Sequence, residues 1–179
     1  MNTACSSNYK RISQSRFAGI HRSHSLLELE ASMPSEIGAI SPMVQQLMRL
    51  IEAWRCIEGN ESAVEMALQE ALSNAVIHGN EMDPDKLVEV HCRCERGKGV
   101  WLIVKDQGNG FDPTAIPDPL VPERLLGERG RGIHLMKFAM DEVSFKRRGA
   151  EVHMRKGPSG QSTTEPPDDE EKVSSRLGE

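Results

Sequence analysis

The sequence predicts an α+β domain, because segments with strand periodicity and segments with helical periodicity follow one another along the chain. Apolar residues recur at helical spacing in two long segments before residue 80, and they alternate with polar residues over residues 87–95. Two further strand-like segments lie between residues 142 and 156. With 179 residues the chain is long enough for one domain with a core of its own.

The first part of the chain predicts an arm, a strand and a helix. Residues 1–24 are rich in Ser, Asn and Arg without periodicity, which indicates a disordered basic arm. Residues 25–31 predict a short edge strand. Helical spacing over residues 36–57 predicts a helix, and an alternative start near Ser41 would make Pro42 the first helical residue and residues 36–40 a separate turn.

The following segments alternate between the two periodicities. Residues 61–77 predict an amphipathic helix that closes at His78-Gly79-Asn80. Residues 87–95 and 100–105 predict a hairpin, and the inward side chains of its first strand are expected to be Val88, Val90, Cys92 and Cys94. Residues 133–140 predict a helix, and residues 142–147 and 151–156 predict two closing strands.

The overall charge and the tails limit the class of protein. The formal net charge of −5 argues against direct nucleic-acid binding as the main activity, because phosphate contacts need a basic surface. No apolar run approaches the roughly 20 residues that span a bilayer, and the basic N-terminal residues lack the apolar stretch of a signal peptide. We therefore expect a cytoplasmic protein without a membrane partner. Residues 157–179 are rich in Pro, Ser and acidic side chains, which predicts a disordered acidic tail.

The four cysteines are predicted to be free thiols. His91, Cys92 and Cys94 lie close together, but no second ligand pair follows at a spacing suited to zinc. Because Cys92 and Cys94 fall on the inward side of a predicted strand, we expect them to pack in the core as small apolar side chains. Cys56 is expected within a helix and Cys5 in the basic arm.

One stretch, E-A-L-S-N-A-V-I-H-G-N, places polar residues four apart on a predicted helix. Glu70, Asn74 and His78 therefore lie on one helical face. Such a stripe can be an ordinary exposed polar face. It can also place a general base beside a neutral oxygen ligand for a hard cation such as Mg²⁺. The stretch alone leaves both interpretations open.

Two glycine-rich segments flank a long Pro-rich loop further along the chain. Asp106-x-Gly108-x-Gly110 comes at the end of a predicted strand, and Gly130-x-Gly132 opens a predicted helix, where backbone N–H groups favour phosphate. Between them, residues 112–129 have little periodicity, which is typical of a functional lid or of a disordered loop. Neither segment is a Walker A loop or a dinucleotide-binding fingerprint.

Taken in order, the motifs EALSNAVIHGN, DQGNGFDP, GRGIHLM and MDEVSF resemble those of the GHKL (Bergerat-fold) ATPase superfamily. More closely they resemble the bacterial anti-sigma-factor serine/threonine-protein kinases. The resemblance covers roughly residues 26–156, so residues 25–156 are expected to form the ATP-binding kinase domain. It implies a two-layer α/β sandwich, in which helices cover one face of a mixed, mostly antiparallel sheet and ATP lies between helices and lid.

The resemblance also implies roles for single residues. Glu70 matches the catalytic general base, and Asn74 matches the ligand of the Mg²⁺ that accompanies ATP. Asp106 matches the carboxylate that accepts a hydrogen bond from the adenine amino group, and Gly108 and Gly110 would let the backbone pass close to the nucleotide. The expected phosphate contacts come from Arg129, Gly130, Arg131 and Gly132, with Arg124 as a further candidate. His78 is interpreted as structural.

For the whole protein, the resemblance implies an anti-sigma regulatory factor. Such a kinase binds a sigma factor and phosphorylates an anti-anti-sigma partner of the STAS type on Ser or Thr, using ATP and Mg²⁺. Members of this family commonly form homodimers. The alternative is an ATP-gated protein-binding module without significant kinase activity, although a pure binder would not require Glu70. A sensor histidine kinase fits less well, because the chain has no helix pair for a phosphorylated His.

Overall fold

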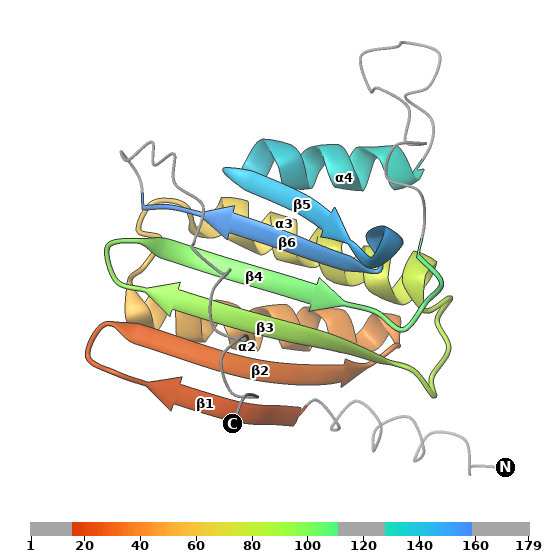
Figure 1. Ribbon diagram of the computed structural model, residues 1–179, viewed down its shortest axis with the longest axis horizontal. Coiled ribbons are helices and arrows are strands. Elements are labelled where there is room, and N and C mark those ends of the chain that lie inside the picture. The colour runs from red at the N-terminus through yellow and green to blue at the C-terminus, as the bar shows by residue number, and fades with distance from the viewer. Residues whose placement is uncertain (1–15, 111–127, 159–179) are drawn as a thin grey trace, which may run out of the picture.

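The computed structural model describes residues 16–110 and 128–158. Its strands form one sheet with the order β1-β2-β3-β4-β6-β5, and each neighbouring pair of described strands is antiparallel (Figure 1). Along the sheet these are β1 (Arg16–Arg22), β2 (Leu26–Pro34), β3 (Leu87–Glu95), β4 (Gly99–Lys105), β6 (Glu151–Lys156) and β5 (Glu142–Lys146).

The helices lie together on one face of this sheet (Figure 1). They are α2 (Ile37–Trp54), α3 (Glu61–Asn74) and α4 (Glu128–Ala139). A π-helical turn, η1 (Ala75–Gly79), continues α3, and a short 3-10 turn, η4 (Arg147–Gly149), joins β5 to β6. The predicted two-layer α/β sandwich is therefore confirmed.

The core lies between the sheet and the helices. The side chains of Val88, Val90, Cys92 and Cys94 are buried, as the alternation in their strand predicted. They face the apolar sides of α2 and α3, whose spacing of three and four residues turns the same side chains towards the sheet. The buried residues of these helices are Ala39, Ile40, Met43, Val44, Leu47, Met48, Ile51, Val64, Ala67, Leu68, Ala71 and Leu72.

The prediction of a disordered arm is wrong for residues 16–22, which form β1. This strand pairs with β2 from Arg16 opposite Ser32 to Arg22 opposite Leu27. Consequently β2 is an internal strand and not the predicted edge strand. The arm shows too few apolar residues for a strand pattern, but the unpaired main chain of β2 and the contact of Phe17 with the core are sufficient to order it. Residues 1–15 lie outside the described part of the chain.

Helix α2 differs from the prediction at both ends. It begins at Ile37, so the alternative start at Ser41 is wrong, and Pro42 lies inside the helix. Pro42 lacks the N–H that would reach the carbonyl of Gly38. Buried side chains on both sides of it, including Ile40 and Met43, hold the helix on the sheet in spite of that loss.

The helix ends at Trp54, before the predicted residue 57. Its last turn is closed by Arg55, which adopts the left-handed conformation with φ of 53°. Cys56 therefore lies in the connection to α3 and not within a helix. Among the described residues, no helix is both long and apolar enough to cross a membrane.

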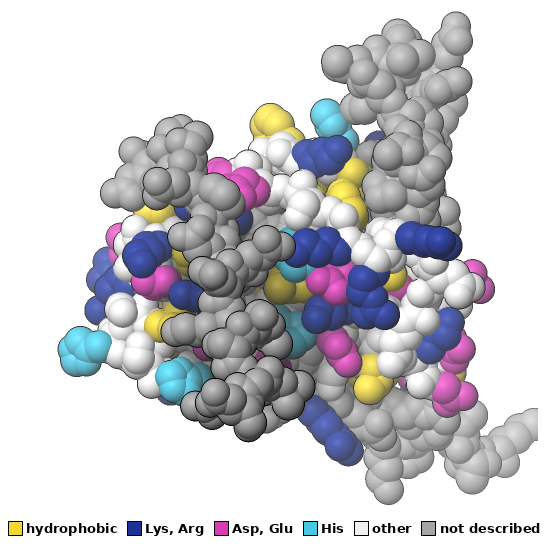
Figure 2. Space-filling model, viewed as in Figure 1, with side chains coloured by type: hydrophobic (Ala, Val, Ile, Leu, Met, Phe, Trp, Pro, Cys, Tyr) yellow, Lys and Arg dark blue, Asp and Glu magenta, His cyan; other side chains and the backbone are white. Residues whose placement is uncertain are grey.

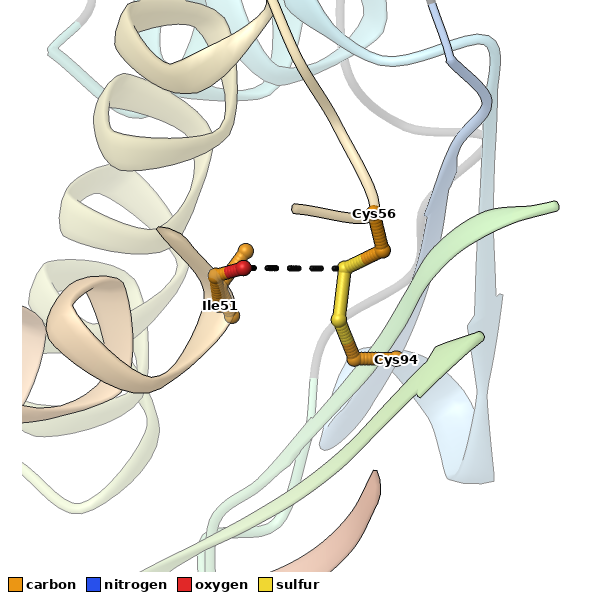
Figure 3. The surroundings of a disulfide bond; sticks show 3 residues. All are labelled: Ile51, Cys56 and Cys94. Carbon is orange, nitrogen blue, oxygen red and sulfur yellow. Dashed lines mark hydrogen bonds between the residues drawn. A yellow bond between two sulfur atoms is a disulfide. The ribbon is translucent and has the colours of Figure 1, made fainter. Parts of the chain in front are cut away.

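A disulfide joins this connection to the sheet. Cys56 and Cys94 are bonded, with their Cα atoms 6.0 Å apart (Figure 3). The prediction of free thiols is therefore confirmed for Cys92, which is buried and unbonded, and wrong for Cys56 and Cys94. Burial raises the pKa of the Cys92 thiol to about 12. The Ile51 carbonyl oxygen lies 3.8 Å from the Cys56 sulfur, a pair that can form an S–H···O hydrogen bond only when the disulfide is reduced.

Removal of this disulfide is expected to lower the melting temperature. The bond closes a loop across 38 residues, and a disulfide with such a loop stabilises the folded state by about 3–4 kcal/mol. Loss of this free energy corresponds to a fall in the melting temperature of about 10 °C. We expect that shift in the double variant Cys56→Ala/Cys94→Ala, and in the wild-type protein on addition of a reductant.

The double variant is also the control, because a reductant should have no further effect on it. Thiol titration of the unfolded, non-reduced wild-type protein should find Cys5 and Cys92 and not all four cysteines. Four reactive thiols would contradict the bond. Disulfides are uncommon in reducing compartments, so the titration of protein taken directly from cells also tests the expected cytoplasmic location.

Candidate functional site

A pocket lies between the helix layer and the last strands of the sheet. Its walls come from α3, η1, β4, α4, β5 and β6, and from the loop that follows β4. The walls are mostly apolar, and three polar side chains, Asn74, His78 and Asp106, interrupt them. The apolar lining residues are Ala71, Ala75, Val104, Ile133, Met136, Phe145 and Val152, and glycines 79, 110 and 149 complete the wall.

Glu70 and Asn74 lie one turn apart on α3, as the four-residue spacing predicted, and α4 crosses over them. A Cβ atom placed on Gly132 would lie 2.6 Å from the Glu70 Oε2 atom and 3.4 Å from the Asn74 Nδ2 atom. A side chain at position 132 would therefore displace the Glu70 carboxylate, and glycine avoids this. The Nδ2 atom of Asn74 is buried and has no hydrogen-bond partner among the described residues.

The helical geometry changes directly after Asn74. Residues 75–79 form a π-turn, which often marks functional sites because it re-aims the side chains around it. The turn places His78 on the pocket wall. From the sequence, His78 is interpreted as structural, and its spacing of four residues from Asn74 indicates this position.

Asn80 connects this turn to the sheet and to the loop after β4. It is fully buried, its Nδ2 atom donates to the Leu87 carbonyl at 3.0 Å, and its Oδ1 atom accepts from the Gln107 backbone N–H at 2.8 Å. The Oε1 atom of Gln107 in turn accepts from the Leu87 N–H at 2.8 Å. Because these bonds fix the residue after Asp106, Asn80 positions one wall of the pocket. Sequence reasoning gave Asn80 no role.

Asp106 follows β4 and points into the pocket. The backbone N–H of Gly108 donates to its Oδ1 atom at 2.8 Å, and within the described part of the chain Oδ2 has no hydrogen-bond partner. The side chain is 9% exposed. Burial raises the pKa of Asp106 above its ordinary value, and the Gly108 hydrogen bond offsets part of that rise. Among the described residues, Oδ2 is therefore the carboxylate oxygen that is left to accept a hydrogen bond from a ligand in the pocket.

The glycines after Asp106 allow close packing of the loop on its neighbours. A Cβ atom on Gly108 would collide with the carbonyl oxygen of Gly79. Gly110 has a φ of 75°, which favours glycine, and a side chain there would collide with the carbonyl of Arg148. The loop is therefore held between η1 and the turn that joins β5 to β6.

The remaining predicted site residues belong to the start of α4 or to the loop before it. The helix begins two residues before Gly130 and not at Ile133, so Arg129, Gly130, Arg131 and Gly132 all lie within its first turns. The Arg131 side chain is exposed. The side chain of Arg129 and the predicted loop up to residue 127, with Arg124, lie outside the described residues. Of the members of this group that are described, Gly132 is the one that lies against Glu70 and Asn74.

Comparison with known proteins assigns the chain to a family. The family model of the histidine kinase-like ATPase domain matches residues 33–156, and the chain therefore belongs to this family. Membership in this family implies that the protein binds ATP.

Several curated relatives that match are named anti-sigma F factors. The protein of Geobacillus stearothermophilus is 35% identical over 98 residues, which cover 52% of this chain and 66% of the relative. That of Halalkalibacterium halodurans is 34% identical over 82 residues, with 45% and 56% covered. That of Clostridium novyi is 34% identical over 98 residues, with 52% and 68% covered. The chain thus spans between about half and about two thirds of the length of these relatives.

Substitution of Gly108 by Ala is expected to weaken ATP binding by about tenfold to a hundredfold, because overpacking of this kind costs about 1–3 kcal/mol. The added Cβ would push the loop away from Gly79 and shift Asp106. Calorimetric titration with ATP measures the change. Gly19→Ala is the matched control, because a Cβ there meets no atom within 4 Å. Equal ATP affinity of the two variants would show that the packing of Gly108 on Gly79 does not shape the pocket.

Proposed function

We propose that this protein is an anti-sigma regulatory factor and an ATP-dependent serine/threonine-protein kinase. It binds a sigma factor and phosphorylates an anti-anti-sigma partner of the STAS type. The observation that carries the proposal is the arrangement of Glu70 and Asn74, one turn apart on α3 and directly under Gly132 of α4. The anti-sigma names of the relatives support the regulatory role.

The residues of the pocket suit a Mg²⁺-nucleotide. Mg²⁺ prefers oxygen ligands and is usually held by one or two protein groups together with substrate phosphates and water. Asn74 supplies a carboxamide whose buried nitrogen has no partner in the part of the chain that the structure describes. Rotation of this carboxamide by 180° about its Cβ–Cγ bond would present its oxygen at the same place. Among the described residues, no three His, Cys, Asp or Glu side chains are grouped so that they could hold a metal ion by themselves.

The proposed roles divide the pocket into two ends. Asp106 would accept a hydrogen bond from the adenine amino group on its free Oδ2 atom, and the apolar wall would cover the base. Asn74 would hold Mg²⁺ at the phosphate end, near the backbone of residues 129–132 at the start of α4. The bound Mg²⁺-ATP would supply the phosphoryl group. Glu70 would accept the proton of the partner's Ser or Thr hydroxyl as that oxygen attacks the γ-phosphorus, and ADP would leave.

A second candidate function is an ATP-gated binding module of a partner-switching system without significant kinase activity. One observation favours it: Glu70 is not among the residues that line the pocket, although Asn74, its neighbour one turn away, is. A kinase must bring Glu70 into contact with the acceptor hydroxyl. A binding module has no such requirement.

The decisive experiment incubates the protein with labelled ATP, Mg²⁺ and a STAS-type protein from the same organism. Label on Ser or Thr of that protein supports the kinase. ATP binding without phosphoryl transfer, together with ATP-dependent capture of a sigma factor, would support the binding module instead. Sedimentation of the protein alone tests the predicted homodimer.

A further inference from the structure

Helix α4 exposes an aromatic side chain that has no place in the core. Phe138 is 82% exposed, and Leu135 on the same helix is 37% exposed. The chain contains only four phenylalanines, and the other two in the described residues, Phe17 and Phe145, pack against the core. A large exposed apolar group in a chain so poor in aromatic residues indicates a contact site.

The exposed residues of α4 form one continuous surface. Arg131, Leu135 and Phe138 follow one another at spacings of four and three, which places them on one side of the helix. His134 and Lys137 are exposed beside them, and we call these five residues the α4 face. The other side of the helix is buried on the core through Ile133, Met136 and Ala139. Figure 2 shows hydrophobic, basic and histidine side chains together at the top of the molecule, where Figure 1 places α4.

The charge of the α4 face differs from that of the chain. The chain has a net charge of −5, yet residues 131–140 include Arg131, His134 and Lys137 and no acidic side chain. Within the described residues, none of these three forms an ion pair. An acidic surface is therefore the complementary partner.

The shape of the α4 face indicates a folded partner. A projecting phenyl ring needs an apolar pocket to bury it, and such anchors in pockets dominate the affinity of protein interfaces. The acidic stretch of this chain at residues 165–171, E-P-P-D-D-E-E, would supply carboxylates. It contains no aromatic or branched apolar side chain, and it would bury little of the ring.

The α4 face is also continuous with the proposed catalytic site. Gly132 lies against Glu70, and Phe138 follows six residues later on the same helix. Six residues of α-helix measure about 9 Å. A protein seated on Phe138 would therefore extend to the edge of the site at Glu70.

We propose that the α4 face is the docking site of the phospho-acceptor protein, a folded partner with an apolar pocket bordered by carboxylates. Phe138 enters the pocket, and the basic residues around it pair with the carboxylates. The proposal rests on the proposed function, since it names where the substrate protein of that kinase binds.

The test measures phosphorylation of the STAS-type protein by wild type, Phe138→Ala and Lys137→Glu. Phe138→Ala should raise the KM for the acceptor by about tenfold or more, as expected for an interface anchor, and leave kcat and the calorimetric affinity for ATP close to wild type. Lys137→Glu should also raise this KM and make it less sensitive to salt. Ile37→Ala is the matched control, because Ile37 is 58% exposed on α2. An unchanged KM in Phe138→Ala would overturn the proposal.

Further measurements distinguish a failure of this proposal from a failure of the proposed function. They also test whether another segment or a second copy of the chain covers the α4 face. If the wild-type protein transfers no phosphate, the kinase assignment fails. Calorimetric binding of the acceptor to wild type and Phe138→Ala, both with a non-hydrolysable ATP analogue, then decides: weaker binding by the variant supports docking, and equal or absent binding overturns it. The Phe138→Ala effect must persist when residues 159–179 are deleted, and its disappearance would assign the α4 face to that segment. Dissociation of a dimer by Phe138→Ala would assign it to a second copy.

Discussion

Replacement of Glu70 by Gln is expected to lower phosphotransfer by at least about a hundredfold, because a positioned general base contributes about 10²–10⁴ in rate. Glutamine keeps the size of the side chain that lies against Gly132, but it cannot accept the proton of the acceptor hydroxyl. Since Glu70 is not part of the pocket wall, ATP affinity should stay close to wild type. Labelled phosphate on the acceptor measures the first quantity, and calorimetry measures the second.

Glu65→Gln is the matched control, since Glu65 is exposed on the same helix and lies more than one turn before Glu70. It should transfer phosphate at the wild-type rate. Transfer by Glu70→Gln at the wild-type rate would remove Glu70 as the base. A wild-type protein that binds ATP and transfers nothing would point instead to the binding module.

The parts of the site that follow from local spacing could be predicted from the sequence. Glu70 and Asn74 share a face of α3 because any helix brings residues four apart together. Asp106 lies at the end of β4 because the strand pattern stops there and the glycines begin. The inward side of β3 could be predicted because successive side chains of a strand point to opposite faces of the sheet. Each of these features is decided by a few consecutive residues.

The features that sequence reasoning missed depend on contacts between distant segments. Strand β1 is ordered by its pairing with β2, and the disulfide joins residues that are 38 positions apart. The role of Asn80 requires that Leu87 and Gln107 lie beside it, which only the folded sheet arranges. The π-turn after Asn74 changes the helical geometry at residues 75–79 without any mark in the sequence pattern. Local patterns carry no information on such partners.

Replacement of Asp106 by Asn is expected to weaken ATP binding by about a hundredfold, because it leaves a buried polar group without a partner at a cost of about 1–3 kcal/mol. The Gly108 N–H requires an acceptor at the Oδ1 position. The carboxamide therefore turns its NH₂ group towards the adenine amino group, and two donors face each other. A base-free polyphosphate should bind the variant and the wild-type protein equally. Equal losses for ATP and polyphosphate would mean that Asp106 does not contact adenine.

The pH dependence of binding and stability separates this effect from damage to the fold. Burial raises the pKa of Asp106. As the pH is lowered, the ATP affinity of the wild-type protein should therefore begin to fall at a higher pH than it would for an ordinary Asp, whose pKa is about 3.9. Asp106→Asn should lack this component. Because the pKa of Asp106 is raised in the folded state, protonation of this side chain stabilises the fold. This stabilisation is lost as the pH rises through the raised pKa. Asn resembles the protonated form, so the variant should melt no lower than wild type at neutral pH. A lower melting temperature there would show that the charge of Asp106 stabilises the fold, and it would contradict the raised pKa of this carboxyl group.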